Sequence, residues 1–520
     1  MHRRHPRAGV SCQGADLPGI FRVLPPLGGR RHNSGPAALL APLAPSVAML
    51  RTKVVCTLGP ATSSREVIRG LVEGGMDLAR VNMSHGEHEG HAALIDAVRD
   101  EADEAGRPVA ILIDLAGPKI RVGDLREEIE LVVGSTVVVA PEESARPGEI
   151  PTSYARLAEE IHPGDAVLMD DGLLELRCVG VDGDRTRLEV VRGGRLKSRK
   201  GINLPTVEVK APSLTGKDLH DLDFALDQGV EYIGLSFVRC PEDVTQLKER
   251  VGKRALVVAK IEKVQALRAL EEIMAETDAV MVARGDLGVE LPFERVPLAQ
   301  KRIIQLANYY GRPVITATQM LESMIEHPRP TRAEASDVAN AILDGSDALM
   351  LSGETATGAY PLQALAAIVR IGTEIERSGF LERGPRYLTR PGPRSHRGAS
   401  PREQAIAAAT VDAARQTGAP AIVVITRSGF SARLVSSYRP SVPIFAVTTD
   451  PATYRQLPAV WGVRPELAQG VEVSYEGLAT FGRSRVLARG LGEPGAAVVV
   501  TSGFPFHEAG TTNTMRLERL

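Results

Sequence analysis

The chain has 520 residues, of which 43% are hydrophobic and 24% are charged, and its formal net charge is −2 at pH 7. This length predicts about three domains, and the near-neutral charge gives no case for a nucleic-acid partner. No apolar run approaches the roughly 20 residues of a membrane span, so we expect no membrane partner. The four widely spaced cysteines form no metal or redox pair, which favours a reducing, cytoplasmic setting.

Residues 1–48 differ in composition from the rest of the chain. They are rich in Arg, Pro, Gly and Ala, and Asp16 is their one acidic residue. An Arg-rich, acid-poor start is typical of a transit peptide. We favour the alternative that translation starts at Met49, directly before the first strand. In both cases we expect this extension to lie outside the fold.

Eight apolar runs of β type follow along the chain. They span residues 51–59, 77–84, 109–115, 232–238, 256–259, 279–283, 313–318 and 348–354. Amphipathic helical stretches, including residues 64–73, 91–105 and 331–343, separate them. Alternating strands and helices predict parallel βα units, and eight such units predict a (β/α)8 barrel (a TIM barrel) in the α/β class.

Polar residues stand at or near the C-terminal ends of these strands, an edge that we call the rim. They are Arg80, Asn82, Ser84, Asp114, Ser236, Lys260, Glu262, Asp286, Thr318, Ser352 and Glu354. The active site of a (β/α)8 barrel lies at this edge. The placement of these residues therefore favours catalysis over a structural role.

Lys260, Glu262 and Asp286 are the most informative of these residues. Side chains two apart on a strand point to the same face, so we expect Lys260 and Glu262 to lie together. Asp286 follows the next strand. Two carboxylates beside an ammonium suit a hard divalent cation and a phosphorylated anion. A structural ion pair is the alternative for these charges taken alone.

The third and fourth strands are separated by many more residues than one βα connection needs. We assign residues 118–212 to an inserted domain, which leaves residues 49–117 and 213–383 for the barrel. The insert contains short β-type runs at residues 137–140, 166–169 and 188–192. These runs alternate with Gly, Pro and Asp turns and predict a small β-barrel, which we expect to close over the site as a lid.

Residues 384–402 are rich in Pro, Gly and Arg and predict a linker. Residues 403–520 then return to βα units. Their helix is expected at residues 403–416 and their strands at residues 421–425, 443–447 and 496–500. This pattern predicts a separate C-terminal α/β domain.

From about residue 51 to residue 520, the chain resembles the pyruvate kinase family, with all three domains in the family's order. The resemblance rests on segments 77–85, 258–262, 281–288, 317–324, 328–334 and 351–355. It implies transfer of the phosphoryl group of phosphoenolpyruvate (PEP) to ADP, followed by protonation of enolpyruvate to pyruvate.

The resemblance also implies roles for the charged residues at the rim. Glu262 and Asp286 would bind Mg2+ or Mn2+. Lys260 and Arg80 would neutralise charge on the transferred phosphoryl group, since phosphoryl transfer is catalysed chiefly by positioning and charge neutralisation.

The substrate carboxylate would be received by the backbone N–H groups of Gly285 and Asp286, beside the Thr318 hydroxyl. The water relay expected to protonate the enolate consists of Thr318, Ser352 and Glu354. By family analogy we prefer this relay to Lys260 acting as a direct acid.

For the nucleotide, the resemblance points to Asn82, His85, Arg121 and Lys200. Lys200 would reach across from the lid. The alternative for its basic segment, residues 197–205, is a solvated turn.

Residues 114–121 depart from the pattern of many family members. Those members have a glutamate where Lys119 stands, and it accompanies a requirement for K+. Here the Lys119 ammonium can supply the charge of a monovalent cation, and Leu115 replaces a hydroxyl residue. A remaining monovalent site would consist of Asn82, Ser84, Asp114 and Leu115. The K+-independent branch of the family has this Lys and Leu, so we expect no K+ requirement.

The loop at residues 426–431 is a candidate effector site. Its residues Thr426, Arg427, Ser428, Gly429 and Ser431 offer hydroxyls, a glycine and backbone N–H groups at a strand-to-helix turn, which make a phosphate cradle. The loop resembles the family's effector site, and sugar phosphates and nucleoside monophosphates both fit. An ordinary helix start capped by Ser428 or Ser431 is the alternative. Family analogy implies a homotetramer.

Two other functions stay open at this stage. A barrel enzyme that forms or cleaves carbon–carbon bonds of pyruvate-like substrates would share the Mg2+ carboxylates but would not need the lid. A catalytically silent metabolite-binding protein would be expected to have lost Lys260 or Arg80, and both are present.

Overall fold

The structure is a computed structural model that describes residues 50–381, 399–504 and 511–520. Met49–Leu520 form one compact unit. The expected extension at residues 1–48 and residues 384–398 of the expected linker lie outside the described residues. The domain boundaries drawn from the sequence stay predictions.

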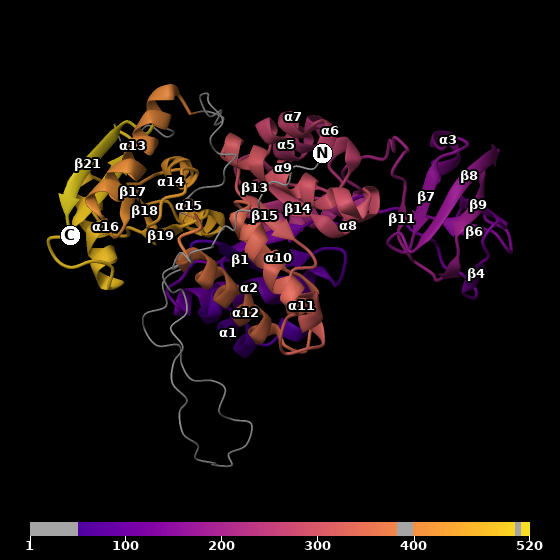
Figure 1. Cartoon of the computed structure of the whole chain (residues 1–520), viewed down its shortest axis with the longest axis horizontal. Helices are drawn as coiled ribbons and strands as arrows, with labels where there is room; N and C mark the ends of the chain where they lie inside the picture. The colour runs from indigo at the N-terminus through magenta and orange to yellow at the C-terminus, as the bar shows by residue number, and fades with distance from the viewer. Residues whose placement is uncertain (1–49, 382–398, 505–510) are drawn as a thin grey trace, which may run out of the picture. The chain divides into compact units, whose positions relative to one another are not determined.

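Within residues 50–381, eight parallel strands close into a barrel (Figure 1). They are β1 (Lys53–Thr57), β2 (Leu78–Asn82), β3 (Ala110–Asp114), β12 (Tyr232–Leu235), β13 (Leu256–Ile261), β14 (Ala279–Ala283), β15 (Val314–Ala317) and β16 (Ala348–Leu351). Their order around the barrel is β1-β16-β15-β14-β13-β12-β3-β2, so each strand pairs with its neighbours in the sequence. The predicted (β/α)8 barrel is confirmed.

Side chains along each barrel strand alternate between two apolar cores. On β1, Val54 and Cys56 join the core that the strands share with the surrounding helices, whereas Val55 joins the core inside the barrel. Leu112 on β3 and Met281 on β14 also belong to the interior core. This period of two explains why polar residues two apart at a strand end meet on one face.

Helices follow the barrel strands, and the three predicted helices correspond to α1, α2 and α10. The helices of this domain are α1 (Arg65–Gly74), α2 (His88–Glu104), α4 (Gly216–Asp227), α5 (Pro241–Val251), α6 (Val264–Arg268), α7 (Leu270–Glu276), α8 (Arg284–Glu290), α9 (Val296–Tyr310), α10 (Arg332–Leu343), α11 (Gly353–Ala356) and α12 (Pro361–Arg377), with 3-10 turns η1 (Pro60–Thr62), η2 (Phe293–Arg295) and η3 (Glu322–Ile325). None of the described helices is both long and apolar enough to cross a membrane.

Helix α1 illustrates how the sequence sets these elements. The Ser64 hydroxyl caps its start by accepting from the Val67 N–H at 3.3 Å, and Gly75 ends it with a φ of 117°. A left-handed glycine at this position is a common helix terminator. The buried residues Ile68 and Leu71 of this helix face the core that the helices share with the barrel strands. Capping at both ends fixes where the chain turns back toward the next strand.

The insert forms a six-stranded sheet, in the order β11-β7-β8-β9-β5-β6, and a two-stranded sheet of β10 and β4. Its elements are β4 (Ile129–Leu131), β5 (Thr136–Pro141), β6 (Ile150–Thr152), α3 (Leu157–Glu160), β7 (Ala166–Met169), β8 (Leu174–Asp182), β9 (Arg185–Arg192), β10 (Gly194–Leu196) and β11 (Ile202–Asn203). The sequence predicted a small β-barrel here, whereas the larger sheet is open, with β11 and β6 as its edge strands. The insert has an apolar core of its own, which includes Leu176 and Leu188.

Residues 399–504 and 511–520 form a five-stranded sheet in the order β19-β18-β17-β20-β21. Its elements are α13 (Pro401–Thr417), β17 (Ile422–Ile425), α14 (Phe430–Ser436), β18 (Ile444–Thr448), α15 (Pro451–Gln456), η6 (Leu457–Ala459), β19 (Val463–Leu467), α16 (Tyr475–Ala488), β20 (Ala497–Ser502) and β21 (Thr514–Arg519). The sequence did not indicate β19, which contains Pro465, or β21, an antiparallel edge strand with charged residues. Both are edge strands, where apolar runs are not required.

A buried charge cluster joins the start of the barrel strands to the C-terminal domain. Lys53 Nζ donates to the backbone oxygen of Val463 at 2.7 Å and lies 3.7 Å from Asp77 Oδ1. Asp77 also lies 2.9 Å from Arg107 and 3.8 Å from Arg464. Burial lowers the pKa of Lys53 to about 7, although Asp77 opposes this shift. Burial of this ammonium therefore lowers the free energy of unfolding by an amount that depends on pH.

We predict that Lys53→Met raises the apparent melting temperature by several degrees more at about pH 6 than at about pH 9. The folded lysine loses its proton near pH 7 and the unfolded lysine near pH 10.5. The cost of burying the charge is therefore full below pH 7 and falls as the pH rises, and Lys53→Met removes it. Thermal melting across this range measures the difference, with the exposed Lys253→Met as control. A difference independent of pH would contradict the prediction.

Candidate active site

Three neighbouring strand ends bring polar side chains into one cluster at the rim. Lys260 on β13 is its centre, with Nζ 3.1 Å from Asp114 Oδ1 and 3.0 Å from Glu262 Oε1. The same ammonium donates to Ser236 Oγ at 2.7 Å. Asp114 ends β3, Ser236 follows β12 and Glu262 follows β13. Lys260 and Glu262 thus share one face and form an ion pair.

The neighbours of Lys260 keep its ammonium protonated. Burial on its own would lower the pKa of Lys260, but the carboxylates of Asp114 and Glu262 outweigh burial and raise that pKa above its usual range. An ammonium with a raised pKa is a lasting positive charge and a poor proton donor near neutral pH. Lys260 is therefore suited to neutralising an anion rather than to acting as an acid.

Arg80 on β2 joins the cluster through Asp114. Its guanidinium donates to Asp114 Oδ2 at 2.8 and 2.6 Å and to Thr57 Oγ1 at 3.0 Å. Burial would raise the pKa of Asp114, but Lys260 and Arg80 lower it, so this carboxylate stays charged between two cations. Gly234 leaves room for it, because a Cβ there would lie 3.0 Å from Asp114 Oδ1. Asp114 thereby positions both cations.

Glu262 and Asp286 are the carboxylates expected to hold a divalent cation. Glu262 is buried, and its Oε2 accepts from the Phe237 N–H at 2.8 Å. Burial raises the pKa of Glu262; Lys260 opposes this, and the nearby Asp286 charge adds to it. Mg2+ binds through one or two carboxylates together with water and substrate oxygens, and a cation here would relieve the repulsion between the pair. The described residues contain no larger group of His, Cys, Asp or Glu suited to a metal.

The loop after β15 holds Thr318 and Gln319 in left-handed conformations, with φ of 64° and 55°. Such backbone costs about 1–3 kcal/mol per residue and clusters at functional sites. Arg284 on α8 donates to the backbone oxygens of both residues and to Asp337 Oδ2 at 2.6 Å. Thr318 Oγ1 accepts from the Gly285 N–H at 2.8 Å, so these two predicted residues meet. Arg284 and Asp337, which lock this loop, were missed from the sequence.

Glu354 is a buried carboxylate that joins the loops after β15 and β16. Its Oε1 accepts from the Leu321 N–H at 3.0 Å, and its Oε2 accepts from the Ser352 N–H at 2.7 Å. The Ser352 hydroxyl is buried without a hydrogen-bond partner among the described residues. An unsatisfied buried hydroxyl is suited to holding a water molecule. The geometry gives Glu354 a structural role in addition to any role in a relay.

The four residues expected at the nucleotide lie on the barrel and on the insert. Asn82 Oδ1 accepts from the Ser84 N–H at 3.2 Å, and the exposed His85 uses its backbone oxygen to bind His91 Nε2 at 2.8 Å.

On the insert, Arg121 donates to the backbone oxygen of Arg199 at 3.2 Å, and Lys200 Nζ lies 2.7 Å from Asp170 Oδ1. Lys200 is thus paired within the insert.

Two residues of the expected monovalent site, Asp114 and Leu115, make other contacts. The Asp114 carboxylate binds Arg80 and Lys260, and the Leu115 side chain is buried in the apolar core. Lys119 Nζ lies 3.6 Å from Asp286 Oδ1. An ammonium therefore stands beside one carboxylate of the proposed divalent site.

A buried group that the sequence did not indicate ties the insert to the barrel. Lys263 Nζ lies 2.5 Å from Glu290 Oε1, and Asn203 Nδ2 donates to the same oxygen at 3.4 Å. Asn203 belongs to β11, where the chain returns from the insert, and Glu290 ends α8. α8 carries Asp286, so this contact links the insert to a predicted metal ligand.

The expected effector loop lies between β17 and α14. Gly429 is the N-cap of α14 with a φ of 74°, and no side chain caps the helix. The alternative of a helix start capped by Ser428 or Ser431 is therefore wrong. Ser431 Oγ is instead 2.7 Å from Thr512 Oγ1, which lies just before β21.

Comparisons with known proteins cover most of the chain. Residues 49–365 match the family described as "Pyruvate kinase, barrel domain", and residues 404–518 match "Pyruvate kinase, alpha/beta domain". The chain is 42% identical to a pyruvate kinase of Mycobacterium tuberculosis over 482 residues, which are 90% of this chain and 98% of the relative. It is 44% identical over 476 residues to one of Mycobacterium intracellulare, with the same coverage. It is 40% identical over 476 residues to one of Staphylococcus aureus, covering 80% of that relative.

We predict that Glu262→Gln and Asp286→Asn each weaken Mn2+ binding by more than about tenfold, because each removes one of two charged ligands. Electron paramagnetic resonance of free Mn2+ in titrations of the purified chain measures the dissociation constant without an activity assay. Glu322→Gln, which changes an exposed carboxylate beyond β15, is the matched control and should leave binding unchanged. Parent-like Mn2+ affinity in both site variants would refute the assignment.

Proposed function

Because this chain belongs to the pyruvate kinase family, it catalyses transfer of the phosphoryl group of PEP to ADP, giving pyruvate and ATP, and we propose that the cluster centred on Lys260 performs this transfer. The observation that carries the assignment is the pairing of Asp114 with both Lys260 and Arg80 at the rim. This pairing fixes two cations side by side, as stabilising a transferring phosphoryl group requires.

Lys260 and Arg80 would contact the phosphoryl group. Their charges are fixed before substrate binds, so little reorganisation is needed when charge develops. Glu262 and Asp286 would hold Mg2+ or Mn2+, which neutralises phosphate charge when bound. The Asp286 charge, in addition to burial, raises the pKa of Glu262. A bound cation would relieve this repulsion between the two carboxylates, which supports the assignment.

The substrate carboxylate would bind the backbone N–H groups of Gly285 and Asp286 at the start of α8. The Gly285 N–H is bound to Thr318 Oγ1, so the carboxylate would take over or share this donor. Thr318 Oγ1 would then lose the Gly285 donor, and its hydroxyl, which donates to the backbone oxygen of Ala317 at 2.7 Å, would turn from that oxygen toward the substrate. This exchange would couple substrate binding to the group expected to begin proton delivery.

Protonation of the enolate would proceed through the relay of Thr318, Ser352 and Glu354 rather than from Lys260. The raised pKa of Lys260 opposes its use as an acid. The buried Ser352 hydroxyl is suited to a relay water, because it has no other partner in the described part of the chain.

ADP would be held by Asn82, His85, Arg121 and Lys200. In this arrangement Lys200 would leave Asp170 to reach the phosphates, because these two side chains are paired at 2.7 Å. Exchange of one anionic partner for another costs little for a lysine that is partly exposed, as Lys200 is. The insert would thus contribute a charge to the site when it closes as a lid.

We also propose that the enzyme works without K+. The family in general uses Mg2+ and a monovalent cation, and Lys119 would take the place of that cation here. Support comes from its ammonium, 3.6 Å from Asp286, and from Leu115, whose buried apolar side chain cannot bind an ion. The remaining residues of the expected monovalent site, Asn82, Ser84 and Asp114, would then serve other contacts.

Regulation, assembly and location are further parts of the proposal. A phosphorylated metabolite would bind the effector loop through Thr426, Arg427, Ser428, Gly429 and Ser431, and the chain would form a homotetramer by family analogy. A cytoplasmic setting is supported by Cys56, Cys178 and Cys240, which are all free thiols among the described residues.

We predict that Lys260→Met lowers kcat by on the order of 10²–10³-fold, the effect of removing one charge-stabilising group in a preorganised site. A lactate dehydrogenase-coupled assay with PEP, ADP and Mg2+ measures this. Mn2+ binding should be retained within a small factor, which separates a catalytic loss from collapse of the site. The assignment is wrong if Lys260→Met keeps most of the parental kcat.

We predict that the parent chain is fully active in potassium-free, sodium-free buffer. Lys119→Glu should lower this activity by on the order of tenfold, equivalent to about 1.4 kcal/mol, and added K+ should restore it. The coupled assay with and without K+ tests both statements, with Lys253→Glu as a control for the charge change. Strong stimulation of the parent by K+ would sink the proposal.

A further inference from the structure

Phe237, which follows β12, has an unusual backbone conformation beside the expected cation site. Its φ of 56° is left-handed, and its N–H donates to Glu262 Oε2 at 2.8 Å. A bulky residue keeps this costly conformation only where its surroundings enforce it. The packing of the buried Phe237 ring therefore helps to maintain the backbone that holds Glu262.

The ring packs against the chain at the point where it leaves the barrel for the insert. A Cβ on Gly117 would lie 2.8 Å from Phe237 Cδ2 and 2.9 Å from Ser236 Cβ, so the bare backbone of a glycine is needed for this close approach. Gly117 is also left-handed, with a φ of 68°, and its N–H donates to Asp218 Oδ1 at 3.0 Å. The departing chain is thus fixed in contact with the ring.

The chain that returns from the insert passes the same ring. A pocket of about 40 Å³ is lined by Phe237, by Pro118 and Ile120 of the departing chain, and by Ile202 and Leu204 of the returning chain. Both covalent connections of the insert therefore meet at one aromatic side chain. Rotation of the insert about these connections would change how they pack on the ring.

Two barrel side chains attach the returning chain beside this pocket. Arg239 donates to the backbone oxygen of Val209 at 2.7 Å, and Gln265 donates to that of Val207 at 3.4 Å. These bonds anchor the end of the connection to the barrel. The connection is therefore suited to act as the pivot of the insert.

A buried polar group extends the same contact to β11. Asn203 donates to Glu290 Oε1 at 3.4 Å, and Lys263 Nζ lies 2.5 Å from the same oxygen. The Lys263 ammonium also lies 5.6 Å from the centroid of the Phe237 ring. A displacement of β11 would thus reach the ring by a polar route as well as through the apolar pocket.

We propose that Phe237 is a positioning residue that couples the insert to the divalent-cation site. Its ring responds to movement of the two connections, and its backbone N–H transmits this movement to Glu262. This coupling rests on the proposed function, in which Glu262 holds Mg2+ or Mn2+. It makes the affinity for the cation depend on the position of the insert.

The test is electron paramagnetic resonance of free Mn2+ in titrations of the purified full chain. Phe237→Ala should weaken Mn2+ binding by at least roughly tenfold, the effect of losing a group that orients a metal ligand. Phe237→Tyr keeps the ring, and the pocket beside it has room for a hydroxyl, so its Mn2+ affinity should match that of the parent. This rescue separates the role of the ring from a general loss of folding.

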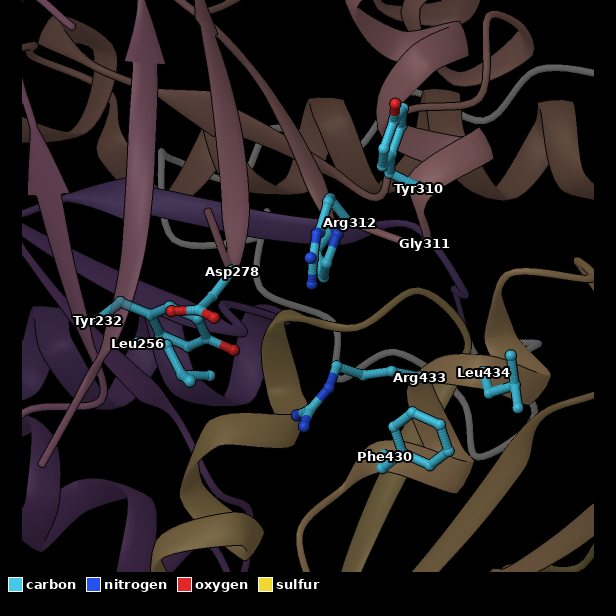
Figure 2. Close-up of a pocket in the computed structure, with 10 residues that line it drawn as sticks. Tyr232, Leu256, Asp278, Tyr310, Gly311, Arg312, Phe430, Arg433 and Leu434 are labelled. Carbon is cyan, nitrogen blue, oxygen red and sulfur yellow. The ribbon is translucent and has the colours of Figure 1, made fainter. Parts of the chain in front are cut away.

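Leu256→Ala is the matched control for loss of an apolar side chain from the barrel. Leu256 begins β13, the strand that Glu262 follows, and lines a separate pocket at the opposite end of the barrel from the rim (Figure 2). Its Mn2+ affinity should stay unchanged, and weakening equal to that of Phe237→Ala would overturn the proposal. Parent-like affinity in Phe237→Ala, with weakened binding in Glu262→Gln, would overturn the coupling alone. Parent-like affinity in both would reject the cation site as well.

A second pair of variants tests the part played by the insert. Leu204→Ala enlarges the pocket from the returning chain, so it should weaken Mn2+ binding, by a smaller factor than Phe237→Ala, although Leu204 is not a proposed ligand. Leu176→Ala truncates another buried leucine of the insert core, on β8, and should leave Mn2+ binding unchanged. Equal Mn2+ affinities in these two variants would overturn the coupling to the insert.

Discussion

The candidate active site at the rim depends on one constraint: the buried ammonium of Lys260 must be surrounded by partners. A buried charge without them would cost several kcal/mol. Asp114 from β3, Ser236 after β12 and Glu262 after β13 meet this requirement, so three adjacent strands must end in register. Because Asp114 also binds Arg80, the same requirement fixes the second cation. The charge arrangement is thus a consequence of barrel packing and exists before any substrate is present.

On the other side of the site, the loops after β15 and β16 are held by hydrogen bonds to backbone groups. The left-handed turn at Thr318 is held by Arg284, and Glu354 receives N–H groups from two separate loops. These buried contacts store strain in a loop that carries a hydroxyl next to the Gly285 N–H. The proposed function, neutralisation of phosphate charge on one side and proton delivery on the other, needs both kinds of arrangement, since a proton relay requires groups without a fixed positive charge.

Much of this could be predicted from the sequence, because apolar runs that end in polar residues determine both the strands and the rim. Lys260 and Glu262 are two apart, so their shared face follows from strand geometry alone. Asp114 was expected at a monovalent ion, and its pairing with Lys260 depends on a contact between residues 146 positions apart, which no local pattern encodes. The pairing of Arg284 with Asp337 and that of Asn203 with Glu290 could not be predicted for the same reason, because their partners are far apart in the sequence.

Strands β1 and β2 connect the two ends of the barrel. β1 begins with Lys53, bound to the C-terminal domain at Val463, and ends with Thr57, which accepts from Arg80. Asp77, which contacts both Lys53 and Arg464, lies three residues before Arg80 on β2. β1 and β2 are paired in register, Val55 with Leu78, Cys56 with Ala79 and Thr57 with Arg80. The charge cluster at one end and Arg80, the proposed phosphate ligand, at the other are therefore joined by one pair of strands.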